Sequence, residues 1–194
     1  METSKVRGFS SLNMTQNLIS DYKPVVSVDG EGFRCSLYVS GCLFACKNCF
    51  NKSIQDFGVG KPYTKELEDR IIKDLAPDYI QGFTLLGGEP MLNTNVAIQI
   101  TDRIRECYGD KKDIWCWTGY KWEELLESIS LDTVNSRKQG LLLNNVDVLV
   151  DGQFIDELKD KTGQLRFRGS TNQRIINVKE SILRGEVVEC KQFD

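Results

Sequence analysis

The chain has 194 residues, of which 25 are basic and 28 acidic, so its formal net charge at neutral pH is −3. This length suits one domain with a sizeable core, and the near balance of charge argues against general binding to nucleic acids. Histidine is absent, which excludes Ser-His-Asp and Cys-His hydrolysis, imidazole acid–base catalysis and every metal site that needs a histidine ligand.

The first part of the chain divides into a polar extension and the beginning of a folded domain. Residues 1–24 contain polar and turn-forming types with little periodicity, and we expect an N-terminal extension that packs as a strand or frays. Residues 25–194 are expected to form a single domain. Residues 35–40 alternate between polar and apolar types and are followed by Gly41, which predicts a strand that leads into a loop.

Helix-like and strand-like segments then alternate along the chain. Leu67, Ile71 and Leu75 recur at four-residue intervals behind Thr64, which predicts a helix with one buried stripe over residues 64–76. The same reasoning predicts helices over residues 94–107 and 121–130, and strands over residues 81–86, 114–117, 146–150 and 175–178.

This alternation is typical of an α/β fold with a mostly parallel sheet and helices packed outside it. A complete eight-unit barrel needs about 250 residues, whereas this chain has room for roughly four to six units of about 30 residues. We therefore expect a partial, open (βα) barrel. No apolar run approaches the roughly 20 residues of a membrane span, and the N-terminus lacks an apolar secretion segment, so we expect no membrane partner.

Three of the seven cysteines lie close together in the sequence. Cys42, Cys46 and Cys49 form a Cys-x₃-Cys-x₂-Cys pattern. The odd total and the missing leader indicate reduced thiols in the cytoplasm rather than a disulfide framework. The four scattered cysteines are interpreted as small, buried apolar side chains; they are Cys35, Cys107, Cys116 and Cys190.

The cysteine triplet is compatible with three kinds of site. A structural zinc ion needs four protein ligands, and Cys35 would have to supply the fourth. A dithiol redox pair at Cys46 and Cys49 fits the Cys-x-x-Cys spacing but leaves Cys42 without a role. A [4Fe-4S] cluster suits the pattern better, because one short loop can hold three corners and leave one iron open for a ligand.

The triplet, followed by Phe50, resembles the signature of the radical S-adenosylmethionine enzymes. In that family the methionine moiety of the cofactor chelates the fourth iron, and reductive cleavage leaves methionine and a 5′-deoxyadenosyl radical. The resemblance implies that Cys42, Cys46 and Cys49 hold the cluster and that Phe50 packs near the adenine. It also implies the partial-barrel fold of that family.

A second motif, Gly-Gly-Glu-Pro at residues 87–90, follows the strand predicted over residues 81–86. Glycines at the carboxyl end of a parallel strand let the backbone approach a ligand closely. The motif resembles the Gly-Gly-Glu motif of the same family, which contacts the methionyl amine. By that likeness the cofactor contacts are Gly88 and the backbone of Asn48, Cys49 and Phe50, with Glu89 as a further candidate.

Over about residues 24–178 the sequence resembles, more narrowly, the activating enzymes of anaerobic (class III) ribonucleoside-triphosphate reductase. The matching segments are residues 39–42, 49–53, 113–120, 148–154 and 168–174. These enzymes usually carry a Gly-Pro-Gly-like stretch where this chain has residues 29–34. Glu31 replaces the proline, which we interpret as a local change of turn.

The resemblance implies both a reaction and its partners. A flavodoxin-like donor would reduce the cluster, and the deoxyadenosyl radical would remove hydrogen from a glycine α-carbon on the large subunit of the reductase. Asp151 and Gly152 are interpreted as a turn or as a cofactor contact. Arg166, Arg168 and Arg174 are interpreted as a solvated basic face or as a docking surface for an acidic partner.

Two alternatives stay open at this point. One is the activating enzyme of another glycyl-radical enzyme, such as pyruvate formate-lyase. The other is a non-enzymatic interaction module that binds zinc or an iron–sulfur cluster through cysteines.

Overall fold

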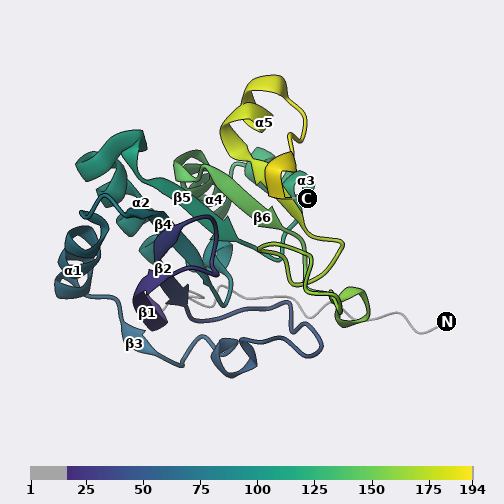
Figure 1. The fold of residues 1–194 in the computed structure, drawn as a ribbon, viewed down its shortest axis with the longest axis horizontal. Helices are drawn as coiled ribbons and strands as arrows, with labels where there is room; N and C mark the ends of the chain where they lie inside the picture. Colours follow the sequence, from purple (N-terminus) through teal and green to yellow (C-terminus); the bar gives the residue numbers. More distant parts are fainter. Residues whose placement is uncertain (1–16, 194) are drawn as a thin grey trace.

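A single sheet runs through the molecule (Figure 1). The computed structural model describes residues 17–193 and places seven strands within them, in the order β3-β1-β2-β4-β5-β6-β7. The strands are β1 (Leu18–Val26), β2 (Phe33–Val39), β3 (Lys61–Pro62), β4 (Ile80–Gly87), β5 (Asp113–Trp117), β6 (Val148–Asp151) and β7 (Arg174–Asn177). The α-helices are α1 (Lys65–Leu75), α2 (Thr94–Tyr108), α3 (Trp122–Ser130), α4 (Val134–Asn145) and α5 (Val178–Arg184).

The centre of the sheet is parallel and its margins are antiparallel. Strands β2, β4, β5 and β6 pair in parallel, as expected from the alternation of strands and helices. At one side β1 pairs antiparallel with β2 and β3, and at the other β7 pairs antiparallel with β6. The architecture is therefore mixed α/β, with β3 and β7 as the two edges of one sheet.

Every helix and strand expected from periodicity is present, with bounds that differ by a few residues. For example, α1 begins after Thr64, whose side chain accepts a hydrogen bond from the backbone of Leu67, as a helix N-cap does. Strand β3 and helices α4 and α5 were not predicted, whereas β1 realises the strand that was one of the two alternatives for the N-terminal extension. Of the expected N-terminal extension, residues 1–16 lie outside the described residues, and residues 18–24 belong to β1.

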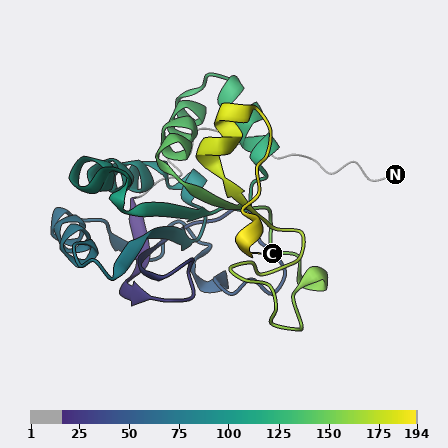
Figure 2. The same cartoon turned by 45° about the horizontal axis from the view of Figure 1, so that its top comes forward.

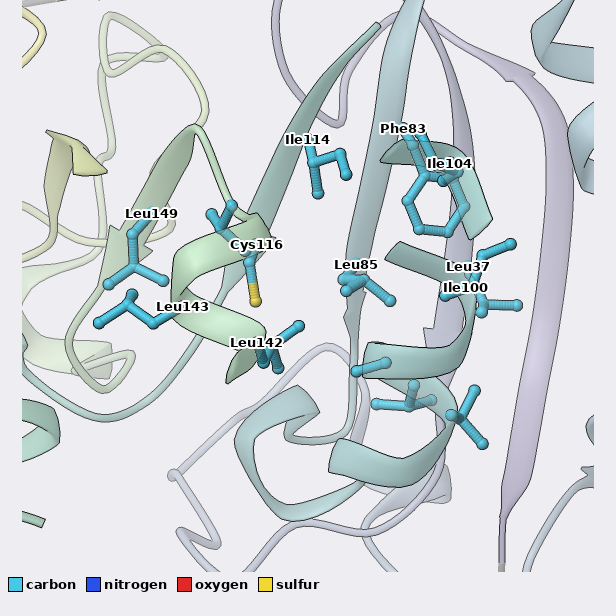
Figure 3. Packing of buried hydrophobic residues seen from close by; sticks show 14 of the residues in the cluster. Leu37, Phe83, Leu85, Ile100, Ile104, Ile114, Cys116, Leu142, Leu143 and Leu149 are labelled. Carbon is cyan, nitrogen blue, oxygen red and sulfur yellow. The ribbon is translucent and has the colours of Figure 1, made fainter. Parts of the chain in front are cut away.

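The main core lies between the sheet and the helices. The parallel register aligns Leu37 of β2, Leu85 of β4, Cys116 of β5 and Leu149 of β6 in one row across the sheet. Figure 3 shows this row facing side chains of α2 and α4, among them Ile100, Ile104, Leu142 and Leu143, and all of these residues are buried. Helix α2 packs against α1 and α4, so the three helices cover one face together (Figure 2).

A second cluster covers the opposite face near β5 and β7. Trp115 stacks on Trp117, with ring centroids 5.6 Å apart, and Phe193 packs edge-on against Trp115 at 5.3 Å. Arg34 is fully buried beside this cluster, with its guanidinium 5.3 Å from the Trp115 ring. It donates a hydrogen bond to Thr84 and pairs with Asp113, so its charge is compensated.

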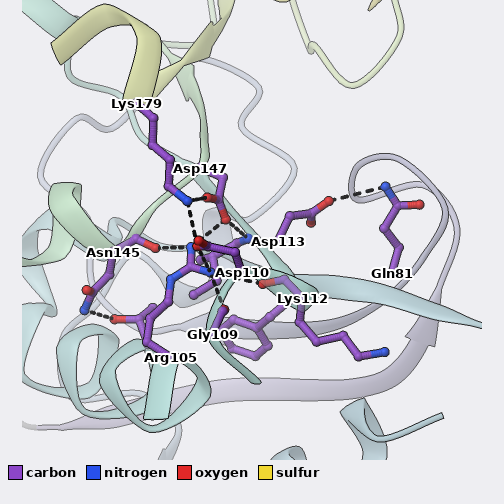
Figure 4. Close-up of polar contacts among 12 residues, drawn as sticks. Gln81, Arg105, Gly109, Asp110, Lys112, Asp113, Asn145, Asp147 and Lys179 are labelled. Carbon is purple, nitrogen blue, oxygen red and sulfur yellow. Dashed lines mark hydrogen bonds and ion pairs between the residues drawn. The ribbon is translucent and has the colours of Figure 1, made fainter. Parts of the chain in front are cut away.

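The amino ends of the central strands are tied together by charged side chains (Figure 4). Asp147, just before β6, accepts a hydrogen bond from the backbone nitrogen of Ile114 at 2.7 Å and pairs with Arg105 of α2 and Lys179 of α5. This carboxylate therefore joins two strands and two helices at the edge that we call the amino edge. The carboxyl ends of the same strands form the opposite edge, the carboxyl edge.

No helix within residues 17–193 combines the length and the apolar composition that crossing a membrane requires.

Candidate functional site

The cysteine loop, residues 40–60, leaves the carboxyl end of β2 and closes on itself. The backbone nitrogen of Gly41 donates to the oxygen of Ile54 at 2.8 Å, and that of Cys42 donates to Gln55 at 2.9 Å. Gly41 has a φ of +88°, and a Cβ there would overlap the ring of Phe57. A glycine is therefore needed at the base of the loop, and the hydrogen bonds fix where Cys42 emerges.

The three cysteines of the triplet face one cavity of about 160 Å³ at the carboxyl edge. Ala45 and Asn48 have φ values of +49° and +56°, and these left-handed residues turn the backbone between the cysteines. The remaining lining comes from the segments that follow β4, β5 and β6 and from nearby aromatic residues; it includes Phe44, Asn51, Leu86, Gly87, Gly88, Glu89, Trp117, Thr118, Gly119, Gly152, Phe154 and Gln173.

Burial favours the neutral thiol at two cysteines of the loop, Cys42 and Cys46. Burial raises the pKa of Cys42 to about 11. It also raises the pKa of Cys46, with a smaller contribution from the neighbouring Cys49. Because thiolates rather than thiols bind metals, loading this site must release protons.

Gly87 and Gly88 bring the end of β4 against the base of the cysteine loop. The backbone nitrogen of Gly88 donates to Val39, and that of Glu89 donates to Gly41, both at 2.8 Å. A Cβ on Gly88 would overlap the carbonyl oxygen of Gly41 and lie 2.9 Å from its backbone nitrogen and carbon. Asn51 donates its side-chain amide to Gly87 at 2.9 Å, which ties the far part of the loop to the same point.

Glu89 is buried, with 1% of its surface exposed. Its carboxylate accepts hydrogen bonds from the backbone nitrogens of Met91 at 2.9 Å and Gly119 at 2.8 Å, and from the hydroxyl of Thr118 at 2.8 Å. Burial raises its pKa to about 7, although the three hydrogen bonds act in the opposite direction. Sequence reasoning missed this contact between the ends of β4 and β5, because nothing local to either segment indicates it.

Of the residues predicted to contact a cofactor, Cys49 and Gly88 line the cavity, whereas Asn48 and Phe50 lie outside that lining. The side chain of Asn48 donates to Asp156 at 2.8 Å. Phe50 is 78% exposed, and its ring lies 6.2 Å from that of Phe154. Both residues therefore lie at the rim of the cavity, against the segment that follows β6.

Other sequence-based candidates have structural partners. Asp151 pairs with Arg174 and accepts a hydrogen bond from the backbone of Trp122 at 2.8 Å. Arg174 also pairs with Glu123, so it is not a free basic side chain. Arg166 lies over the rings of Phe167 and Phe193. Asp151 therefore holds strands and helices together, while its neighbour Gly152 lines the cavity.

The donor set of the cavity fits an iron–sulfur cluster better than a zinc ion. Cys35, the candidate fourth zinc ligand, is buried in β2 and donates its thiol to Pro24 at 3.1 Å. Its position in the strand is roughly 13 Å from the strand end at Val39. The thiolates of a cubane cluster each bind a different iron, so the triplet needs no fourth protein ligand at one shared metal ion.

Comparison with known proteins agrees with this geometry. Residues 28–176 match the family model of the 4Fe-4S single cluster domain. The chain is 45% identical to the anaerobic ribonucleoside-triphosphate reductase-activating protein of Escherichia coli (strain K12) over 157 residues, which cover 78% of this chain and 93% of that protein.

Two further relatives carry the same name. The protein of Vibrio cholerae serotype O1 is 44% identical over 159 residues, covering 79% of this chain and 94% of that protein. The protein of Enterobacteria phage T4 is 34% identical over 154 residues, covering 78% and 88%. The chain therefore belongs to the family of anaerobic ribonucleoside-triphosphate reductase-activating proteins and carries its 4Fe-4S single cluster domain.

Proposed function

We propose that this protein uses a 4Fe-4S cluster and S-adenosylmethionine to generate the glycyl radical of anaerobic ribonucleoside-triphosphate reductase. The observation that carries the proposal is the placement of Cys42, Cys46, Cys49 and Gly88 around one cavity at the carboxyl edge. The matched cluster domain and the shared name of the relatives support it. We interpret the parallel centre of the sheet as part of an open, partial barrel of the radical S-adenosylmethionine type.

In this proposal Cys42, Cys46 and Cys49 each bind one iron, and the fourth iron is left for the cofactor. A cluster held by these cysteines would supply the electron for reductive cleavage of S-adenosylmethionine, the chemistry that would lead to removal of hydrogen from a glycine of the reductase. Gly88 and the backbone of Asn48, Cys49 and Phe50 orient the cofactor. None of these steps needs a side-chain acid or base, which agrees with the absence of histidine.

The partner in this proposal is the large subunit of the reductase, and a flavodoxin-like protein is the electron donor. In this proposal the partner's segment approaches along the exposed ring of Phe50, which lies 6.2 Å from the ring of the cavity-lining Phe154. We place the protein in the cytoplasm, since an odd number of cysteines with three of them in one short loop suits a compartment that keeps thiols reduced.

The test is anaerobic reconstitution of the full chain with iron and sulfide, followed by EPR with and without S-adenosylmethionine. Cys42→Ala, Cys46→Ala and Cys49→Ala should each abolish formation of 5′-deoxyadenosine under dithionite. Cys107→Ala is the matched control, because Cys107 is an exposed cysteine on α2, and it should behave as the wild type. Full cofactor cleavage by any of the three loop variants would contradict the proposal.

The alternatives are separated in the same experiment. A colourless protein that holds stoichiometric zinc and produces no 5′-deoxyadenosine would favour an interaction module. A glycyl-radical EPR signal that arises with pyruvate formate-lyase but not with the reductase would favour the other activating enzyme.

A further inference from the structure

Glu89 joins three segments of the carboxyl edge that are far apart in the sequence. Its backbone nitrogen donates to Gly41, the residue before Cys42. Its carboxylate accepts hydrogen bonds from Thr118 and Gly119, which follow β5. One buried residue therefore connects the base of the cysteine loop to the corner formed by residues 118–120, which we call the β5 corner.

The β5 corner in turn touches the middle of the cysteine triplet. A Cβ on Gly119 would overlap the ring of Phe44, so this ring packs directly on the glycine backbone. Phe44 also meets Tyr120 edge-on, with ring centroids 4.8 Å apart. Because Phe44 lies between Cys42 and Cys46 in the chain, its position constrains both thiols.

Both oxygens of the Glu89 carboxylate are already used in hydrogen bonds within the protein. One oxygen accepts from both Met91 and Thr118, the other accepts from Gly119, and the residue is 1% exposed. Removing one partner of a buried hydrogen bond to a charged group leaves the other unsatisfied, which is costly. A direct contact between this carboxylate and a cofactor amine would have to compete with these donors.

We propose that Glu89 is a positioning residue, which fixes the spacing of the thiols through the β5 corner and Phe44 rather than binding the cofactor with its carboxylate. The inference rests on the proposed function in assigning those thiols to the cluster. It concerns the protein before any cluster or cofactor is present, so it can be tested in the metal-free chain.

The experiment compares Glu89→Gln with the wild type over a range of pH. Whichever way the Gln amide turns, its nitrogen faces the backbone donor of Met91 or of Gly119 and cannot accept from it. The substitution also removes a charge that raises the pKa of Cys42 and Cys46, so maleimide labelling of each cysteine in the metal-free protein is measured by mass spectrometry as a pH profile. We expect the rate constant of the thiolate forms to rise about tenfold, whereas loss of the charge alone would shift the profile to lower pH and leave that constant unchanged. After reconstitution, the EPR spectrum of the reduced cluster should change even without S-adenosylmethionine.

Three further variants separate positioning from general loss of stability. Asp147→Asn removes a carboxylate that joins strands at the amino edge (Figure 4), and it should leave thiol labelling unchanged while it lowers the unfolding temperature. Thr118→Val removes one donor to Glu89 and the acceptor of the Tyr120 backbone nitrogen in the same corner, so it should accelerate labelling. Thr118→Ser keeps the hydroxyl and should restore the wild-type rate. This pair keeps the test decisive if Glu89→Gln fails to fold.

The contrary result is equally clear. If Glu89→Gln and Thr118→Val keep the wild-type rate constant for the thiolate forms, keep the cofactor-free EPR spectrum and lose only affinity for S-adenosylmethionine, then Glu89 is a cofactor ligand and the proposal is wrong. If the wild type fails to cleave S-adenosylmethionine, the proposed function falls, but labelling of the metal-free thiols still decides the role of Glu89.

Discussion

Gly88→Ala tests whether close backbone contact between β4 and the cysteine loop defines the site. The added methyl group would overlap the carbonyl oxygen of Gly41 and lie 2.9 Å from its backbone nitrogen and carbon. These are backbone atoms of a residue held by hydrogen bonds to Ile54 and Glu89, so they cannot rotate away as a side chain can. The φ of Gly88 is not in the left-handed region, so the effect of the substitution is steric.

Overpacking of this kind costs about 1–3 kcal/mol, and we expect the upper end because no flexible atom can yield. Urea denaturation of the metal-free chain should show that loss in the free energy of unfolding. Displacement of Gly41 also shifts the adjacent Cys42, so iron incorporated per chain on reconstitution should fall as well.

Gly140→Ala is a control for which we expect the opposite change in the free energy of unfolding. Gly140 lies in α4, and a Cβ there would meet Ile129 at an ordinary 3.5 Å. Alanine is favoured over glycine in a helix by about 1 kcal/mol, so this variant should be more stable and bind iron normally. A Gly88→Ala protein that is as stable as the wild type would refute the steric reasoning.

Two further predictions follow from the same site. Burial raises the pKa of Glu89 from 4.5 to about 7. Between those pH values the folded protein therefore binds more protons than the unfolded chain. The free energy of unfolding of the metal-free protein should fall as the pH rises through that window, by at most about 1.4 kcal/mol per pH unit. Glu89→Gln should remove this slope in urea titrations at several pH values, and an unchanged slope would assign it to another group. Phe50→Ala should leave the free energy of unfolding within about 0.5 kcal/mol, because the ring is 78% exposed. If the ring packs on the adenine, S-adenosylmethionine binding, followed by EPR titration, should weaken by several-fold to about tenfold; equal affinity would exclude that contact.

The elements that could be predicted from the sequence are those with strong local periodicity. Helix α1 has a clear apolar stripe and a Thr64 cap, and the central strands are apolar because both faces are covered. Helix α4 was missed because its sequence places three leucines in succession among polar residues. For β1 the sequence left a strand and a frayed segment open, because the strand is only half buried and its pairing with β2 depends on a neighbour rather than on its own pattern.

The candidate site divides in the same way. The cysteine triplet and the Gly-Gly-Glu motif are local patterns, so their residues could be named from the sequence alone. The partners of Glu89 could not, since Thr118 and Gly119 come close only through the register of β4 and β5. The ion pair of Asp151 with Arg174 could not be predicted either, because it requires β6 and β7 to be adjacent and antiparallel.

The cavity exists because glycines follow several adjacent strands at one edge. Gly88 comes after β4, Gly119 after β5 and Gly152 after β6, and all three line the space that the cysteines face. Parallel strands deliver their carboxyl ends to the same edge, so segments distant in sequence meet there, and residues without side chains leave room between them. The amino edge and the carboxyl edge, where the central strands begin and end, are therefore built differently. At the amino edge Asp147 fills the junction with ion pairs. At the carboxyl edge the strand ends are held by backbone contacts and by the buried carboxylates of Glu89 and Asp151, which leaves the space beside the thiols open.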